Sequence, residues 1–305
     1  MLFRSVSLEH PPRPLRKIAT TTPPRRPARD LSRAAQGPGL RGPGFTATLR
    51  RLATAMATHV IYKLGPFTVP AFAGERHVRV YLPSEQPEGD PLPVLYIFDG
   101  QNIFHDDPSA AGGWYLHHAA HDLHAEGKLA PVIVGIDHGG ADRIHELSPF
   151  PFEDSRGDAD HLIDWLVDEL VPRIHREFPV RRDVAGTAIG GSSMGGLAAL
   201  YTHYRRPDIF GAALCMSPSL WVADRQIFAR LAELPRPPTS RIYVDAGAHE
   251  GEMLPDARRL VAQLLASGHS DDELMWRPDP YGAHSEAHWR KRAPEALAWL
   301  FAPPA

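Results

Sequence analysis

Ser193 is the centre of a G-x-S-x-G segment that spans residues 191–195. Such a segment is typical of a sharp turn between a strand and a helix, and the turn exposes the serine oxygen at its tip. The glycine register selects between two adjacent serines, since Ser192 would lie between Gly190 and Met194 instead of between two glycines. Ser193 is therefore the candidate nucleophile.

A serine hydroxyl is a weak nucleophile until a base removes its proton, and a carboxylate must then orient that base and stabilise its charge. In turns of this kind the partners follow along the chain in the order serine, acid, histidine. His284 lies in a Gly-Ala-His sequence just before the last predicted helix, so we assign it as the base. His288 comes one helical turn later and is predicted to lie on the surface of that helix.

Two carboxylates, Asp245 and Glu250, compete for the role of the acid. Asp245 directly follows the apolar residues 242–244 and is predicted to lie within a strand, where its short side chain points to one fixed face. Glu250 lies beyond Gly247, on a predicted loop that can bend toward the histidine, and its side chain is longer. We therefore assign the acid to Glu250 and keep Asp245 as the alternative.

Attack of a serine on a carbonyl group also requires two preorganised N–H donors for the negative oxygen that develops. The residue after the nucleophile, Met194, supplies one donor in this kind of turn, and a loop after an earlier strand supplies the other. That loop follows Phe98, the last residue of a predicted strand, and we assign the second donor to Gln101. Gly100 is expected to allow the turn, and Asp99 to give a supporting hydrogen bond.

Apolar runs typical of buried strands alternate with helical patterns from His59 onward. This alternation predicts an α/β protein with a mostly parallel central sheet and helices on both faces. Together with the serine–acid–histidine order, it indicates the α/β-hydrolase fold. Strands are predicted at residues 77–82, expected to be antiparallel, and at 94–98, 132–136, 187–191, 212–216 and 242–244; helices are predicted at 114–126, 160–178, 254–266 and 286–301.

The first 58 residues differ in composition from the rest, with eight prolines, ten arginines and no helical or strand periodicity. We expect a disordered Pro/Arg-rich segment. A transit peptide, a basic interaction tail and a mis-assigned start are the alternatives, and the last, with Met56 as the true first residue, is favoured. No apolar stretch typical of a secretory signal follows the early arginines. Residues 59–305 are predicted to form one catalytic domain.

The charge balance of the predicted domain excludes several kinds of partner. Residues 1–58 carry 11 Lys/Arg and 2 acidic residues, so subtraction from the totals of 33 and 36 leaves 22 and 34, a net charge of −12. Such an acidic domain without a basic stripe is a poor partner for nucleic acid or an anionic membrane, and no apolar run is long enough to span a membrane. Cys215 is the only cysteine, which excludes a disulfide within the chain and favours a cytoplasmic location. Nothing in the sequence indicates the oligomeric state.

Three histidines, His117, His121 and His124, share one face of the predicted helix 114–126 and could bind a metal. We interpret them as a solvated helix face, because no acidic fourth ligand has a suitable spacing. No metal and no organic cofactor is predicted.

Four segments carry a resemblance to a known family: residues 95–104 (LYIFDGQNIF), 191–196 (GSSMGG), 216–221 (MSPSLW) and 282–284 (GAH). Together they resemble the putative esterase family of α/β-hydrolases, over about residues 75–302. That family contains enterochelin, feruloyl and acetylxylan esterases, S-formylglutathione hydrolases and mycolyltransferases. The resemblance implies a metal-independent serine esterase that forms an acyl-enzyme, and its feruloyl-esterase branch favours Glu250 as the acid.

The resemblance also implies a substrate pocket. Arg143 and Glu146 resemble the first two positions of an Arg-x-x-Glu-x-x-Pro region that lies near the substrate in enterochelin-esterase-like members. They fall in an insert, residues 138–157, which lacks periodicity and is expected to form a lid or pocket wall. Asp99 and Trp221 complete the candidate pocket. The expected substrate is a small acyl or aromatic ester, and an acyltransferase of the same fold or a non-catalytic binding member are the alternatives.

Overall fold

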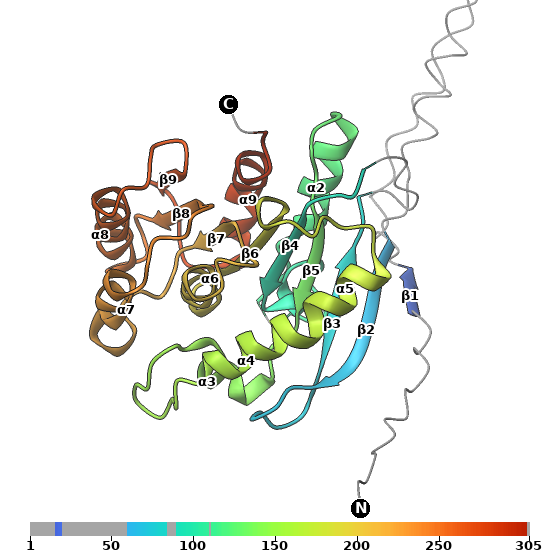
Figure 1. The fold of residues 1–305 in the computed structure, drawn as a ribbon, viewed down its shortest axis with the longest axis horizontal. Coiled ribbons are helices and arrows are strands. Elements are labelled where there is room, and N and C mark those ends of the chain that lie inside the picture. Colours follow the sequence, from blue (N-terminus) through green and yellow to red (C-terminus); the bar gives the residue numbers. More distant parts are fainter. Residues whose placement is uncertain (1–15, 20–59, 84–89, 110, 304–305) are drawn as a thin grey trace, which may run out of the picture.

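The computed structural model of the chain describes residues 16–19, 60–83, 90–109 and 111–303. Within these ranges, nine strands form one sheet, with helices packed on both faces (Figure 1). The order across the sheet is β1-β2-β3-β5-β4-β6-β7-β8-β9. The strands are β1 (Arg16–Ala19), β2 (Val60–Thr68), β3 (Glu75–Tyr81), β4 (Val94–Phe98), β5 (Val132–Ile136), β6 (Thr187–Ser192), β7 (Ala212–Met216), β8 (Arg241–Gly247) and β9 (Leu274–Asp279).

The strand directions confirm the predicted α/β class with a mostly parallel sheet. β3 is antiparallel to both β2 and β5, whereas the pairs from β5 through β4, β6, β7 and β8 to β9 are all parallel. Every residue of β4, β5, β6 and β7 is buried, which explains why these strands lack polar alternation. Because they are parallel, their carboxyl ends meet at one edge of the sheet, where open α/β sheets bind ligands.

Alternate residues of β4 point into two separate hydrophobic clusters. Val94, Tyr96 and Phe98 belong to one cluster, and Leu95 and Ile97 belong to the other. Helices α3 to α8 cover the first cluster, and α2 and α9 cover the second (Figure 1). The helices are α2 (Leu116–Ala125), α3 (Arg143–Leu147), α4 (Ala159–Trp165), α5 (Val171–Glu177), α6 (Met194–Arg205), α7 (Val222–Glu233), α8 (Met253–Ala266) and α9 (Glu286–Leu300). None of these described helices is long and apolar enough to cross a membrane.

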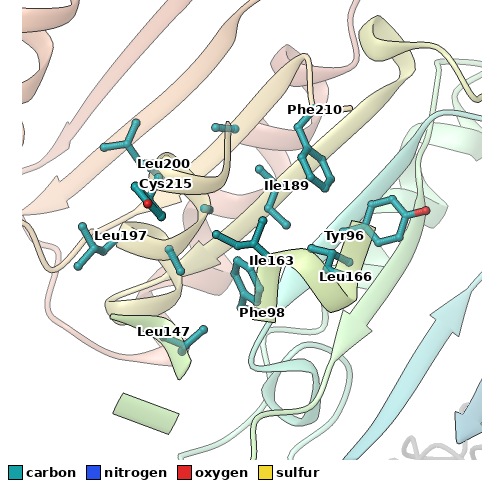
Figure 2. Close-up of a cluster of buried hydrophobic side chains, with 14 of the residues drawn as sticks. Tyr96, Phe98, Leu147, Ile163, Leu166, Ile189, Leu197, Leu200, Phe210 and Cys215 are labelled. Atoms are coloured by element: carbon teal, nitrogen blue, oxygen red, sulfur yellow. The ribbon is translucent and has the colours of Figure 1, made fainter. Parts of the chain in front are cut away.

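Figure 2 shows the part of the first cluster that lies over β4 and β6. Tyr96 from β4 and Ile189 from β6 lie there with Phe210, all without exposed surface. The rings of Tyr96 and Phe210 meet edge-to-face, with centroids 6.0 Å apart. This packing fixes the central strands, and with them the edge of the sheet at which β6 ends.

Replacing Phe210 with alanine is expected to lower the free energy of unfolding by about 3–5 kcal/mol, because a buried ring is lost and a cavity remains. Urea unfolding followed by circular dichroism measures this loss. Leu265→Ala is the control, since Leu265 is 43% exposed and its truncation should change stability by about 0.5 kcal/mol or less. Equal losses in the two variants would contradict the role of Phe210 in the core.

The predicted helices and strands are observed, with ends that differ by up to three residues. The helix predicted at residues 160–178 consists of α4, a π-helical turn over Leu166–Leu170, and α5. The elements β1, β2, α7 and β9 were not predicted. The insert at residues 138–157 is more regular than expected, because it contains a 3₁₀ turn (Gly140–Asp142) and α3, which buries Leu147.

The interpretation of the α2 histidines as a solvated face is wrong for His117. Its ring is completely buried and packs against the rings of Phe104 and His105. Position 117 falls on the face of α2 that packs toward the sheet, so this imidazole is part of an aromatic cluster. In the part of the chain that the structure describes, no group of three or more His, Cys, Asp or Glu is arranged to hold a metal ion.

The prediction for residues 1–58 lies outside the described residues, apart from β1. This strand pairs antiparallel with β2, from Arg16 opposite Lys63 to Ala19 opposite Val60. The interpretation of the rest of the segment stays a prediction.

Candidate active site

Ser193 lies between β6 and α6, at the carboxyl edge of the sheet. Its φ of 56° and ψ of −122° lie outside the regions that residues with a side chain usually adopt, as expected of a strained strand-to-helix turn. A Cβ atom on Gly191 would lie 2.4 Å from the carbonyl carbon of Gly195, so only glycine permits this close approach. The Ser193 N–H donates to the Met216 carbonyl at 3.0 Å, which anchors the turn to β7.

Three side chains from three loops form one hydrogen-bonded chain at this edge. Ser193 Oγ lies 2.9 Å from His284 Nε2, and His284 Nδ1 lies 3.0 Å from Glu250 Oε2. Glu250 lies in the loop between β8 and α8, and His284 lies between β9 and α9. An ionised carboxylate only accepts hydrogen bonds, so Nδ1 carries the proton and Nε2 accepts the serine hydroxyl. The imidazole is therefore in the tautomer that can take a proton from serine.

The Glu250 carboxylate is enclosed by donors. Its side chain has no exposed surface, and Oε1 accepts hydrogen bonds from Ser217 Oγ and from the Gly247 N–H, both at 2.9 Å. Burial acts to raise the pKa of Glu250, but the hydrogen bonds from His284 and Ser217 outweigh it and hold this pKa below its usual value. Glu250 is therefore ionised beside His284 at neutral pH.

Asp245 lies within β8, as predicted, and its side chain is also completely buried. Oδ1 accepts the Ser217 N–H at 2.8 Å, and Oδ2 lies 2.8 Å from Arg292 Nε. Burial raises the pKa of Asp245 to about 6, although the charge of Arg292 acts to lower it. Of the two competing carboxylates in the described residues, only Glu250 reaches His284.

The two candidate oxyanion donors lie in the first turns of two neighbouring helical segments. Met194 is the first residue of α6, and Gln101 lies in the 3₁₀ turn Gly100–Asn102 after β4. Backbone N–H groups in the first turn of a helix have no acceptor within that helix. A Cβ atom on Gly100 would lie 2.5 Å from the carbonyl carbon of Gly135, so this turn also requires glycine. Since β4 and β6 pair directly, both turns lie side by side at the serine.

Residues 70–300 match the family described as Putative esterase, and this range contains the serine, both carboxylates, the histidine and both candidate donors. The chain belongs to this esterase family. The match confirms the resemblance found in the sequence, and the structural neighbours confirm the α/β-hydrolase fold. The chain is a carboxylic ester hydrolase.

The relatives found by sequence are distant, and a solved structure of low sequence identity shares the fold. The uncharacterized protein YbbA of Bacillus subtilis (strain 168) is 24% identical over 245 residues, which cover 75% of this chain and 94% of YbbA. Iron(III) salmochelin esterase of Escherichia coli O6:H1 is 27% identical over 232 residues, 70% of this chain and 52% of that protein. The chain therefore spans about half the length of the siderophore esterase. The crystal structure of the BES protein from Bacillus cereus superposes with a TM-score of 0.65 at 20% identity, covering 79% of this chain and 95% of BES.

The predicted pocket residues of the insert differ in their surroundings. Arg143 donates from Nε and Nη2 to the two oxygens of Asp99, at 2.7 and 2.8 Å, and 26% of its side chain is exposed. Glu146 is buried, with Arg76 Nη1 at 2.5 Å and the Gly139 N–H at 2.9 Å as partners. Arg143 thus reaches the end of β4 beside the serine, whereas Glu146 fixes the insert to β3.

Trp221 lies in the loop after β7 and is 41% exposed. Its ring meets that of Phe152, from the insert, edge-to-face with centroids 6.0 Å apart. In the same loop, Ser219 Oγ lies 3.2 Å from Ser193 Oγ. The insert and this loop therefore form an aromatic wall near the serine, which supports the interpretation of the insert as a pocket wall.

Three residues behind the site were not predicted: Ser217, which contacts Glu250, and Trp289 and Arg292, which both donate to Ser217. The last two lie on α9, 72 and 75 positions beyond Ser217. Arg292 gave a usable signal, because it falls on the apolar face of the predicted helix 286–301, where a charge requires a partner. Ser217 lies in the segment 216–221 that carries the family resemblance, but nothing in its type or spacing indicates a contact with Glu250.

A cavity of about 640 Å³ lies at the opposite edge of the sheet, where β7 and β8 begin and α9 ends. Its walls include Gly211, Arg241 and Trp299. Among the described residues that line it, none belongs to the candidate site, and open parallel sheets bind ligands at the other edge. The candidate active site at Ser193 is therefore separate from this cavity.

Proposed function

We propose that the chain hydrolyses esters through Ser193, His284 and Glu250 by way of an acyl-enzyme. The observation that carries the proposal is the hydrogen-bonded chain from Glu250 through His284 to Ser193, with contacts of 3.0 and 2.9 Å. As Ser193 Oγ attacks the ester carbonyl carbon, His284 Nε2 takes the hydroxyl proton, and Glu250 stabilises the imidazolium. The backbone N–H groups of Met194 and Gln101 stabilise the negative oxygen of the tetrahedral intermediate.

Collapse of the intermediate breaks the bond to the alcohol, and His284 gives its proton to the leaving oxygen. The acyl group then remains bound to Ser193. Water attacks the carbonyl carbon of this ester while His284 takes a proton from the water. The carboxylic acid then leaves as His284 returns a proton to Ser193 Oγ. One water is consumed, and one acid and one alcohol are formed.

The proposed substrates are esters with a small acyl or aromatic group. The exposed Trp221 ring, packed on Phe152, offers an apolar surface for such a group. A salmochelin esterase among the relatives supports the inclusion of siderophore esters among the candidates. The chain spans only about half of that relative, so a siderophore ester as the substrate of this chain belongs to the proposal.

A panel of acetyl, butyryl, feruloyl, formylglutathione and siderophore esters tests this function. We expect the full chain to release free acid and free alcohol in equal amounts from at least one small acyl or aromatic ester. Product analysis by liquid chromatography also detects transfer of the acyl group to an added alcohol. Transfer without free acid would favour an acyltransferase, and inertness toward every ester would contradict the proposal.

Incubation with EDTA is expected to leave the hydrolysis rate unchanged. The proposed proton transfers use an imidazole, and the oxyanion is stabilised by backbone donors, so no step depends on water bound to a metal. Initial rates before and after chelation and dialysis give the comparison. A rate that EDTA abolishes and Zn²⁺ restores would contradict this mechanism.

A further inference from the structure

Ser217 lies directly behind Glu250 and has no exposed surface. It follows the last residue of β7, and its φ of 40° lies in the left-handed region that residues with a side chain rarely adopt. Its hydroxyl has three close partners: Glu250 Oε1 at 2.9 Å, Trp289 Nε1 at 3.0 Å and Arg292 Nη2 at 2.8 Å. Ser217 therefore connects the carboxylate that contacts His284 to helix α9.

These contacts determine where the hydroxyl hydrogen of Ser217 points. The indole of Trp289 and the guanidinium of Arg292 can only donate, so they occupy the two lone pairs of Ser217 Oγ. The single hydroxyl hydrogen must then go to a carboxylate. Glu250 Oε1 lies 2.9 Å away, whereas Asp245 Oδ1 lies at 3.5 Å, the outer limit for such a bond. Ser217 therefore donates to Glu250.

Arg292 is a buried cation whose nearest counter-charge is Asp245. Its side chain is 8% exposed, and its Nε lies 2.8 Å from Asp245 Oδ2, a close ion pair that is not aligned as a hydrogen bond. Glu250 Oε1 lies farther from this guanidinium, 3.6 Å from Nη2. Asp245 thus balances the charge of Arg292, and Glu250 Oε2 stays available to His284.

We propose that Ser217 is a positioning residue of this site: its hydroxyl, held by Trp289 and Arg292, orients the Glu250 carboxylate toward His284. The inference rests on the proposed function, in which Glu250 is the acid. Ser217 Oγ and the Gly247 N–H both hold Oε1, so the carboxylate cannot rotate and Oε2 stays at Nδ1 of His284. A hydrogen bond to a charged group is stronger than one to a neutral group, which suits a residue that fixes an anion.

A double-mutant cycle with Ser217→Ala and Glu250→Gln tests this role. Ser217→Ala alone is expected to lower kcat roughly 10- to 100-fold, the loss typical of one hydrogen bond to an ion, while KM changes less than about threefold. In the Glu250→Gln background the same substitution should lower kcat less than about threefold. In that variant, Ser217 would bind Oε1 of the glutamine, and the glutamine amide N–H would face Nδ1 of His284. Loss of the Ser217 hydroxyl then removes no interaction that supports catalysis.

Ser240→Ala is the matched control, since Ser240 is also buried and bonds His203 and His269 instead of the site. It should keep kcat while losing stability, as judged by urea unfolding. If Ser217→Ala does not fold, Trp289→Phe, which removes one donor to Ser217, enters the same cycle with an expected three- to tenfold loss.

The outcomes separate this inference from the proposed function. If Glu250→Gln loses most of its kcat, the assignment of the acid stands. A normal kcat in Ser217→Ala, or an equal loss of kcat from this substitution with Glu250 present and in the Glu250→Gln variant, would then overturn only the positioning role of Ser217. A normal kcat in Glu250→Gln would instead overturn the assignment of the acid, and with it the role of Ser217. The proposal is supported only if Ser217→Ala causes a large loss of kcat when Glu250 is present and little loss in the Glu250→Gln variant.

Discussion

Ser193→Ala is expected to reduce the turnover of p-nitrophenyl acetate by roughly five to six orders of magnitude. Alanine has no oxygen that could form the acyl-enzyme, and His284 would have no hydroxyl to deprotonate. The fold should persist, because only one half-buried oxygen is removed from a turn that its glycines and the Met216 carbonyl maintain. Steady-state kinetics on the purified variant, with circular dichroism as the test of folding, measures the effect.

Ser192→Ala is the matched control for this variant. Ser192 is the last residue of β6 and is 5% exposed, one position from the nucleophile. Its hydroxyl contacts neither His284 nor the candidate donors among the described residues, so its loss should change kcat less than about tenfold. Collapse of activity in Ser192→Ala with normal activity in Ser193→Ala would reverse the assignment of the nucleophile.

Glu250→Gln is expected to lower kcat by roughly 10³- to 10⁴-fold, because the amide can hold His284 in the wrong tautomer and cannot stabilise the imidazolium. Activity should not reach zero, since the serine and the oxyanion donors remain. Asp245→Asn should lower kcat less than about tenfold. Asp245 balances Arg292 behind the site, and its carboxylate has no contact with His284 among the described residues.

Measuring kcat for these two variants side by side decides which carboxylate is the acid. Both substitutions remove one charge from a buried side chain of nearly unchanged shape, so each is the control for the other. Thermal unfolding of both variants separates a loss of fold from a loss of catalysis. Near-normal turnover in Glu250→Gln with collapse in Asp245→Asn would contradict our assignment.

Strands with continuous apolar runs and helices with strong periodicity were predictable from the sequence, because their burial follows from the pattern. The fully apolar run at residues 94–98 is observed as β4, and the helix predicted at residues 254–266 is observed as α8. β2 and β9 were missed because each is partly exposed and carries a proline in its run. α7 was also missed, and its residues 223–225, which follow its first residue Val222, do not have helical backbone angles.

The residues of the site were predictable where local sequence restricts the backbone. Gly191, two residues before Ser193, and Gly100, directly before Gln101, are required by close backbone contacts, and such requirements are visible in a single sequence. The contacts of Ser217 with α9 were not predictable, since they join residues more than 70 positions apart whose spacing follows no motif. The choice between Asp245 and Glu250 relied on strand and loop assignments, and the structure confirms both of those assignments.

The central claim, that Ser193 is the nucleophile activated by His284, is tested most directly by locating a covalent adduct. The full chain is incubated with a fluorophosphonate, digested, and analysed by tandem mass spectrometry to find the modified residue. We predict one adduct, on Ser193, that forms much more slowly in a His284→Ala variant because the hydroxyl then lacks its base. An adduct on Ser192 or Ser219, or no adduct in a preparation that hydrolyses esters, would contradict the claim.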